Sequence, residues 1–204
     1  MALVNHAKRE INAKIVYFGP PGGGKSTALQ YIFSRIKPSL RGELKKVPTG
    51  GDSLLFFDFS PFDAPLPDGY RVRLHVYTLT GPVANPATWK MTLKGADGLI
   101  IVANPSPERF SDVQNSVAQL KDLLSAYGVG LRDTPAVLQM NVFGQEQPAM
   151  SCEQFASTAN LAGLPCRLSC VASGEGVLEA LTTLSRLVLD RVDAQYKRRD
   201  DRAG

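Results

Sequence analysis

Residues 13–36 read AKIVYFGPPGGGKSTALQYIFSRI, and this stretch decides the fold. The segment 13–19 is an apolar run with the length of a buried strand, and the segment 24–36 has the spacing of a helix. Between them, Gly19 to Ser26 match the phosphate-binding pattern G-x-x-x-x-G-K-S/T, in the strand–loop–helix context that this pattern requires. The alternative is a glycine-rich turn that happens to contain Lys and Ser. Because motif and context agree, we predict a phosphate site here.

The residue types of this loop suit a phosphate group. The helix that follows the loop offers the positive end of its dipole. Lys25 is predicted to reach the β- and γ-phosphates, the hydroxyl of Ser26 to ligate Mg²⁺, and Thr27 to add a contact on the α-phosphate side. Four glycines let the main chain wrap closely around the anion, so that successive N–H groups point at it: Gly19, Gly22, Gly23 and Gly24.

Apolar runs and helical patterns alternate along the rest of the chain. This alternation predicts an α/β fold of three layers, in which helices cover both faces of a mainly parallel sheet, as in P-loop NTPases. We expect one domain over residues 1–196 and a polar end, 197–204, that frays into solvent. The predicted strands are 54–59, 71–79, 98–104, 136–141 and 166–170, and the predicted helices are 87–95, 111–127, 152–162 and one from residue 177.

Composition excludes several other classes of protein. The 204 residues are 44% hydrophobic and 21% charged, and Lys plus Arg exceed Asp plus Glu by only 23 to 19, too weak an excess to indicate DNA or RNA binding. Two histidines, His6 and His75, leave little room for a multi-histidine metal site. No signal peptide or membrane-spanning segment is evident, and three cysteines without a Cys-x-x-Cys pair make a disulfide unlikely. We expect a cytoplasmic protein with Cys166 and Cys170 as core thiols.

Several segments beyond the loop also resemble those of the bacterial gliding-motility small GTPases, the MglA family, which is related to the Ras and Arf GTPases. The resemblance covers about residues 4–190. It rests on residues 9–20, 24–32, 55–59, 74–78 with Gly81, 93–98 and 172–177.

This resemblance implies a Ras-like fold and a switch, loaded with GTP or GDP and Mg²⁺, that controls bacterial cell polarity and motility. It also implies an activating partner of the Roadblock (MglB) type and recruitment to a cell pole or a membrane-associated complex. It places Gly81 at the γ-phosphate. It places the base near Asn141, Val171 and Ala172.

Base recognition departs from the family pattern Asn-Lys-x-Asp, because the chain has Asn141-Val142-Phe143-Gly144. Gly144 has no carboxylate to accept hydrogen bonds from guanine, and the loss of such a bidentate contact costs about 2–4 kcal/mol of discrimination against adenine. Asn141 is expected either to hold the base or to tie down the phosphate loop. Phe143 is a candidate for stacking, and Glu146 is an acid that would substitute only if the loop were re-routed.

The switch residues depart as well. Ser53 and Leu54 stand where the family has an arginine finger and a Thr, and Thr49 would serve only if the register moved. The sequence Thr80-Gly81-Pro82 replaces Pro-Gly-Gln, so the Gln that orients the attacking water is missing. Thr78 replaces the acid of the D-x-x-G motif; Asp58 is expected either to hold a Mg²⁺-bound water or to brace the sheet.

Three functions remain open from the sequence: an active GTPase switch, a pseudo-GTPase that scaffolds partners without cycling nucleotide, and an adenine-nucleotide P-loop protein. An arginine finger alone supplies about 10³–10⁵ in rate. Because the phosphate loop is intact while the hydrolytic groups are not, we expect nucleotide binding with weak or absent intrinsic hydrolysis and action through partners.

Overall fold

A computed structural model describes residues 2–81, 85–144 and 148–203, with side chains described as far as Ala194. In these ranges eight strands form a sheet with the order β3-β4-β5-β2-β6-β7-β8, and β1 pairs with β2. The strands are β1 (Leu3–Asn5), β2 (Glu10–Phe18), β3 (Lys45–Pro48), β4 (Ser53–Phe59), β5 (Arg71–Thr80), β6 (Gly98–Ala103), β7 (Ala136–Asn141) and β8 (Cys166–Ser169). The α-helices are α1 (Lys25–Arg35), α2 (Pro86–Leu93), α3 (Phe110–Ser125), α4 (Cys152–Thr158) and α5 (Val177–Ala203).

The sheet is mainly parallel, which confirms the predicted fold class. Strands β5, β2, β6, β7 and β8 run parallel to their neighbours in this order. Strand β4 pairs antiparallel with β5, and β3 pairs antiparallel with β4. The carboxyl ends of the parallel strands therefore share one edge of the sheet, where ligands of open α/β folds bind.

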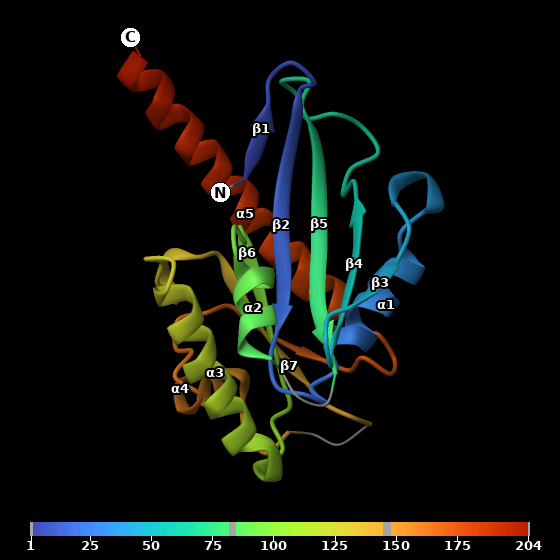
Figure 1. The fold of residues 1–204 in the computed structure, drawn as a ribbon, viewed down its shortest axis with the longest axis vertical. Helices are drawn as coiled ribbons and strands as arrows, with labels where there is room; N and C mark the ends of the chain where they lie inside the picture. Colours follow the sequence, from blue (N-terminus) through green and yellow to red (C-terminus); the bar gives the residue numbers. More distant parts are fainter. Residues whose placement is uncertain (1, 82–84, 145–147, 204) are drawn as a thin grey trace.

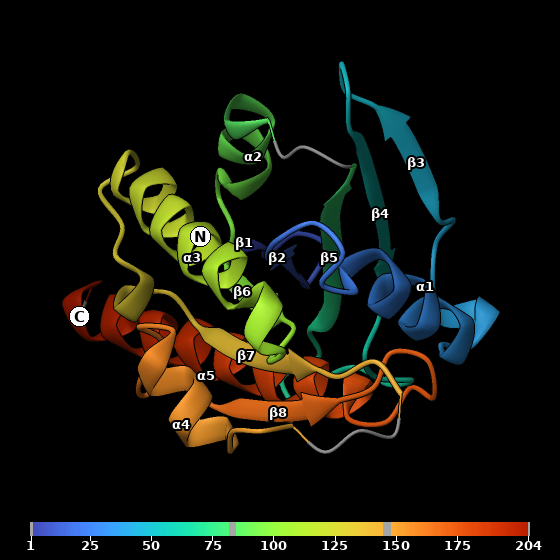
Figure 2. The same cartoon turned by 90° about the horizontal axis from the view of Figure 1, so that it is seen from below.

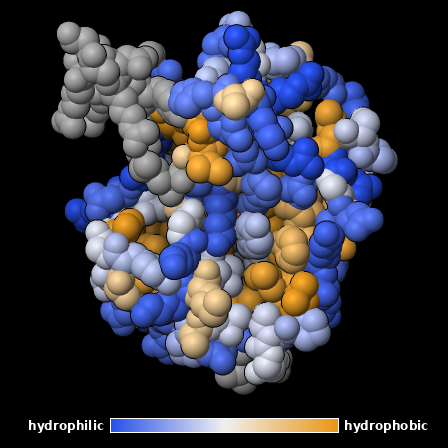
Figure 3. Space-filling model, turned by 45° about the horizontal axis from the view of Figure 1, so that its top comes forward, coloured by the Kyte–Doolittle hydropathy of each residue, from blue (hydrophilic) through white to orange (hydrophobic). Residues whose placement is uncertain are grey.

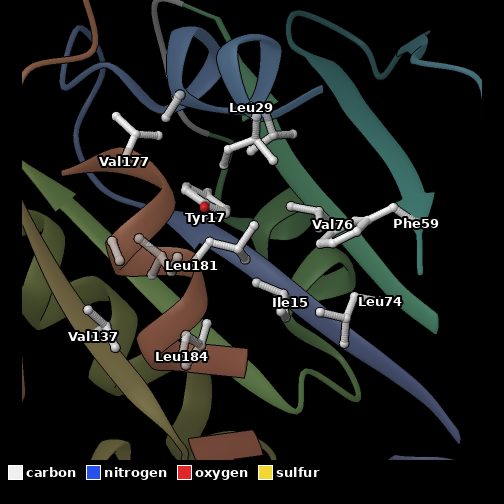
Figure 4. Packing of buried hydrophobic residues seen from close by; sticks show 14 of the residues in the cluster. Ile15, Tyr17, Leu29, Phe59, Leu74, Val76, Val137, Val177, Leu181 and Leu184 are labelled. Carbon is white, nitrogen blue, oxygen red and sulfur yellow. The ribbon is translucent and has the colours of Figure 1, made fainter. Parts of the chain in front are cut away.

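Helices cover both faces of the sheet, as Figure 2 shows. Successive residues of β2 point to opposite faces of the sheet, so both faces are apolar and are covered by helices. Ile15 and Tyr17 point to the face covered by α1 and α5. Val16 and Phe18 point to the face covered by α2, α3 and α4. Figure 4 shows Ile15 and Tyr17 among side chains of α1 and α5, including Leu29, Leu181 and Leu184. The two buried clusters hold the parallel strands in place, including the carboxyl end of β2, from which the glycine-rich loop begins.

Two strands were not predicted from the sequence. Strand β3 lies at one edge of the sheet and all four of its residues are exposed, so it has no apolar face to give a periodic pattern. Strand β1 has only three residues and pairs antiparallel with β2. Elements this short are held by their neighbours rather than by their own hydrophobic pattern.

The end of the chain differs from the prediction of a frayed tail. Helix α5 continues to Ala203, and its last described buried side chain is Val192. Figure 1 shows the end of this helix extending past the sheet near the C-terminus. The polar residues 197–203 thus belong to the part of a long helix that leaves the body of the protein, and the fraying of this part stays a prediction.

The surface carries only scattered large apolar side chains. The face in Figure 3 is mostly hydrophilic, with apolar residues in separate patches. Met91 and Leu3 are exposed by 77% and 68%, the largest values among the described large hydrophobic residues. Among the described residues, none of the helices has the length and apolar content needed to span a bilayer.

A disulfide joins two elements at the β8 edge, which corrects the expectation that no disulfide forms and that Cys166 is a core thiol. Cys152 at the start of α4 is bonded to Cys166 at the start of β8, with Cα atoms 5.7 Å apart and a sequence separation of 14. The chain leaves along α4 and returns to begin β8 beside the start of the helix. Cys170 remains a thiol and is partly exposed.

We predict that this disulfide stabilises the fold. Closing a loop of this length contributes up to about 3 kcal/mol by restricting the unfolded chain. Urea unfolding of the oxidised protein should have a higher midpoint than unfolding in a strong thiol reductant. The variant Cys170→Ser should keep this difference and Cys152→Ser should abolish it. Equal midpoints, with an intact mass that retains both thiol hydrogens, would contradict the assignment.

Candidate phosphate-binding site

The glycine-rich loop connects the carboxyl end of β2 to the start of α1. Strand β2 ends at Phe18 and α1 begins at Lys25, which is the arrangement predicted from the motif. Figure 2 shows this connection at the centre of the sheet, between α1 and α3. The predicted phosphate residues Gly19, Gly22, Gly23, Gly24, Lys25, Ser26 and Thr27 all lie in this connection or in the first turn of α1.

Two glycines let the loop pass close to neighbouring elements. Gly19 has φ +147°, and a side chain there would overlap the carbonyl oxygen of Val102 at the end of β6. Gly24 has φ +101°, and an added Cβ would lie 2.5 Å from Nδ2 of Asn141. A larger residue at either position would push the loop away from β6 or β7, so the glycines fix its path.

Lys25 is the buried cation of the site. Its side chain is 7% exposed, and Nζ donates hydrogen bonds of 2.8 Å to the carbonyl oxygens of Gly19 and Pro20. An ammonium has three N–H donors, so one remains for a ligand. Burial lowers the pKa of Lys25 to about 8, and the negative charge of Asp52 opposes part of this shift. A bound anion would offset the cost of burying this charge.

The start of α1 is suited to an anion. Its N-cap residue, Gly24, makes no side-chain capping hydrogen bond, and the first turn contains no acidic residue. The first N–H groups of a helix have no partner within the helix, and they carry the positive end of its dipole. Ser26 is partly exposed and Thr27 is exposed.

Asn141 braces the loop. It is fully buried at the end of β7, and its Nδ2 donates to the carbonyl oxygen of Gly23 at 3.0 Å. Its Oδ1 accepts from the backbone N–H of Val171 at 3.0 Å and from Ser169 Oγ at 3.4 Å. The sequence left two roles open for this residue; the geometry supports the tie to the phosphate loop, and the contact with a base stays a prediction.

The residues predicted to contact the base lie at the ends of two neighbouring strands. Asn141 ends β7, and Val171 and Ala172 follow β8. Val171 is buried and Ala172 is exposed, so of these two only Ala172 presents its side chain to solvent. Phe143 is 49% exposed, and Gly144 offers no side chain. Glu146, the acid considered as a substitute, lies outside the described residues. The structure therefore brings the predicted residues to one place without supplying a carboxylate from the described positions.

The end of β5 lies beside the loop. Thr78 pairs in register with Tyr17, two residues before Gly19, and its Oγ1 donates to the carbonyl oxygen of Tyr17 at 3.0 Å. The hydroxyl that replaces the family's acid is thus tied to the sheet. Gly81 follows β5 directly, and Pro82 lies outside the described residues.

Asp58 takes the bracing role that the sequence left as one of two alternatives. It pairs in register with His75, and its carboxylate forms an ion pair with Arg73. Leu55, not Asp58, is the residue of β4 opposite Thr78, so Asp58 lies three positions farther from the loop edge along β4. In this structure its geometry gives no support to the expected water-mediated Mg²⁺ contact.

One acidic residue near the loop was missed by sequence reasoning. Asp52, in the turn between β3 and β4, is only 6% exposed. Its carboxylate accepts a hydrogen bond of 3.1 Å from the backbone N–H of Asn85 and lies against Gly81. A single Asp in a Gly-Gly-Asp turn carries no sequence signal for burial, because such turns are normally at the surface.

One hollow borders the phosphate loop, and another borders the segments that follow β6 and β7. One, of about 510 Å³, is lined by Gly19, Pro20, Pro21, Arg109 and residues of α3 that include Asp112 and Gln119. Another, of about 290 Å³, is lined by residues that include Asn104, Val142 and Phe143. No group of three or more His, Cys, Asp or Glu side chains in the described ranges is arranged to hold a metal ion by itself.

Comparison with known proteins gives the family of this loop and fold. No family model matches the chain. It is 36% identical over 190 residues to the mutual gliding-motility protein MglA of Myxococcus xanthus (strain DK1622), a match that covers 93% of this chain and 96% of the relative. This likeness extends over the phosphate loop, the sheet and the helices alike. The chain therefore belongs to the MglA family of gliding-motility small GTPases.

Proposed function

We propose that the chain binds a guanine nucleotide with Mg²⁺ at the loop 19–26 and acts as a nucleotide-dependent switch in bacterial gliding motility and cell polarity. The observation that carries this proposal is Lys25, a buried ammonium with one N–H left for a ligand beside an uncapped helix start. The membership of the chain in the MglA family supports the guanine nucleotide and the motility role.

The described residues fit a nucleotide phosphate. The close approach of Gly19 to Val102 and of Gly24 to Asn141 fixes the path of the main chain around the proposed phosphate site. Lys25 would contact the β- and γ-phosphates, and Ser26 would hold Mg²⁺ together with phosphate oxygens. Because the described residues contain no acidic cluster able to hold a metal alone, Mg²⁺ would bind with the nucleotide rather than before it.

Base selectivity is proposed to be weak. The buried Asn141 already uses both ends of its amide on the protein, and Gly144 has no carboxylate for guanine. Phe143, which follows β7, and Ala172, which follows β8, are exposed. They would contact the base through apolar surface, without hydrogen bonds from their side chains. Such contacts distinguish guanine from adenine poorly, because every base has a π-face.

Hydrolysis is proposed to depend on a partner. Ser53 stands where the family has an arginine finger, and the Thr78 hydroxyl is held by Tyr17. A Roadblock-type partner would accelerate GTP hydrolysis by inserting the missing catalytic groups into the site or by ordering them there. If this partner bound the segments that carry the switch residues, around Ser53 and Gly81, its affinity would also depend on whether GTP or GDP is bound.

We predict that Lys25→Ala lowers the affinity for a fluorescent GDP analogue roughly hundredfold, since it removes a charge-assisted hydrogen bond in a buried site. The matched control is Lys37→Ala, because Lys37 is exposed and pairs with the exposed Asp63. Fluorescence titration in millimolar Mg²⁺ gives the dissociation constants. Equal affinities for the two variants would show that the loop is not the site.

The affinity for GDP should fall as the pH rises from 7.5 to 8.5. The pKa of Lys25 is about 8 without ligand, so the free protein loses this proton across the range. A bound diphosphate favours the charged form, so binding above pH 8 must take up a proton, and affinity drops by at most tenfold per pH unit. Calorimetry in two buffers of different ionisation enthalpy measures the uptake. A flat affinity without proton uptake would contradict the role of Lys25.

Single-turnover hydrolysis of GTP by the chain alone should be slower than about 10⁻³ per second, because the groups that orient water and stabilise the transferred phosphoryl are missing. Phosphate release is measured with GTP and with ATP, alone and with a Roadblock-type partner. Acceleration of GTP hydrolysis by the partner is the expected result. Rapid hydrolysis by the chain alone, or a preference for ATP, would contradict the proposal.

A further inference from the structure

The segment 170–176, between β8 and α5, contains Ala172, one of the residues predicted to contact the base. Hydrogen bonds close this segment on itself. The backbone N–H of Gly174 donates to the carbonyl oxygen of Cys170 at 2.7 Å, and the backbone N–H of Cys170 donates to the carbonyl oxygen of Glu175 at 2.9 Å. These bonds give the segment its shape, but its position relative to the phosphate loop depends on contacts with other elements.

Helix α1 makes two such contacts, and Figures 1 and 2 show the segment beside this helix. Gly24, the N-cap of α1, lies against Val171, because a Cβ added to Gly24 would be 3.3 Å from Cγ2 of Val171. Farther along α1, the ring of Tyr31 lies against Gly174, because a Cβ added to Gly174 would overlap Cζ and Oη of that ring. The segment therefore follows α1 from its N-cap to Tyr31.

The ring of Tyr31 is itself held in place. It is partly buried and packs against the apolar cluster on the face covered by α1 and α5. The guanidinium of Arg35, one helical turn later, lies over the ring at 5.0 Å from its centroid, which adds a cation–π attraction. Gly174 has φ +85° and no side chain, so the ring reaches the main chain directly. Tyr31 thus supports the segment at Gly174.

We propose that Tyr31 is a positioning residue for the nucleotide: by supporting Gly174, it keeps the base contacts in one position relative to the phosphate loop. The inference rests on the proposed function, in which the phosphates bind at Lys25 and the base binds near Ala172. Lys25 and Tyr31 belong to the same helix, so one rigid element sets the position of both ends of the nucleotide. A segment ordered in advance loses less conformational freedom when the base binds, and this raises the affinity.

Displacement of a fluorescent GDP analogue by GDP and by inorganic pyrophosphate, in millimolar Mg²⁺, tests this inference. Tyr31→Ala should weaken GDP roughly tenfold, because the segment 170–176 must then be ordered on binding, while the affinity for pyrophosphate changes less than about twofold. Tyr31→Phe keeps the ring against Gly174 and should stay within about threefold of the wild type for GDP. A residue needed only for general stability would not separate the two ligands in this way.

Tyr127→Ala is the matched control. Tyr127 is also partly exposed, and its hydroxyl donates to the carbonyl oxygen of Lys90 at 2.8 Å. It lies between the end of α3 and the start of β7, at the edge of the sheet opposite the phosphate loop. This substitution should change neither affinity.

Gly174→Ala is a second variant that tests the same contact from the other side. Its methyl group would overlap the ring of Tyr31, so GDP should bind more weakly. In the Tyr31→Ala background the ring is gone, and Gly174→Ala should then cost less affinity than it does in the wild type. The strain of Ala at positive φ is present in both backgrounds, so the difference isolates the contact. This comparison uses GDP alone and decides the question even where pyrophosphate binds too weakly to measure.

Three results would overturn the role of Tyr31: an unchanged GDP affinity in Tyr31→Ala, an equal loss for GDP and pyrophosphate, or additive effects of Tyr31→Ala and Gly174→Ala. Each of them leaves the proposed function standing, provided that Lys25→Ala loses GDP. A wild type that binds neither GDP nor pyrophosphate would overturn the proposed function and this inference with it.

Discussion

The buried ammonium of Lys25 is the interaction on which the site depends. Two of its three N–H groups are committed to the carbonyl oxygens of Gly19 and Pro20, so the lysine closes the loop on itself. Burial makes the charge costly, as the lowered pKa shows, and an anion at the third N–H relieves that cost. These contacts of Lys25 support the proposal that the loop binds a phosphate.

The rest of the fold keeps this loop in position. Val102 at the end of β6 limits one side, and Asn141 at the end of β7 ties Gly23 to the segment after β8. Each contact comes from the carboxyl end of a parallel strand, and the strands are fixed by the clusters on both faces of the sheet. A shift of β8, which the disulfide fastens to α4, would reach the loop through Val171 and Asn141.

Sequence reasoning found the parts of the fold that have local signals. The buried strands, the amphipathic helices and the loop 19–26 were predicted because apolar periodicity and glycine spacing are properties of a segment. It missed β3, whose exposed residues have no apolar face, and the bond from Cys152 to Cys166, which depends on how the chain returns after α4. Asp52 was missed for the same reason, because its burial arises from Gly81 and Asn85, more than 25 residues away in sequence.

Hydrogen–deuterium exchange of the backbone, measured by mass spectrometry with and without saturating GDP and Mg²⁺, tests the central claim most directly. If the main chain of the loop grips a phosphate, the amides of residues 22–27 become strongly protected when nucleotide is added, and those at the far ends of the strands do not change. Bound GDP with no added protection in this segment would contradict the account, because the nucleotide would then be held elsewhere.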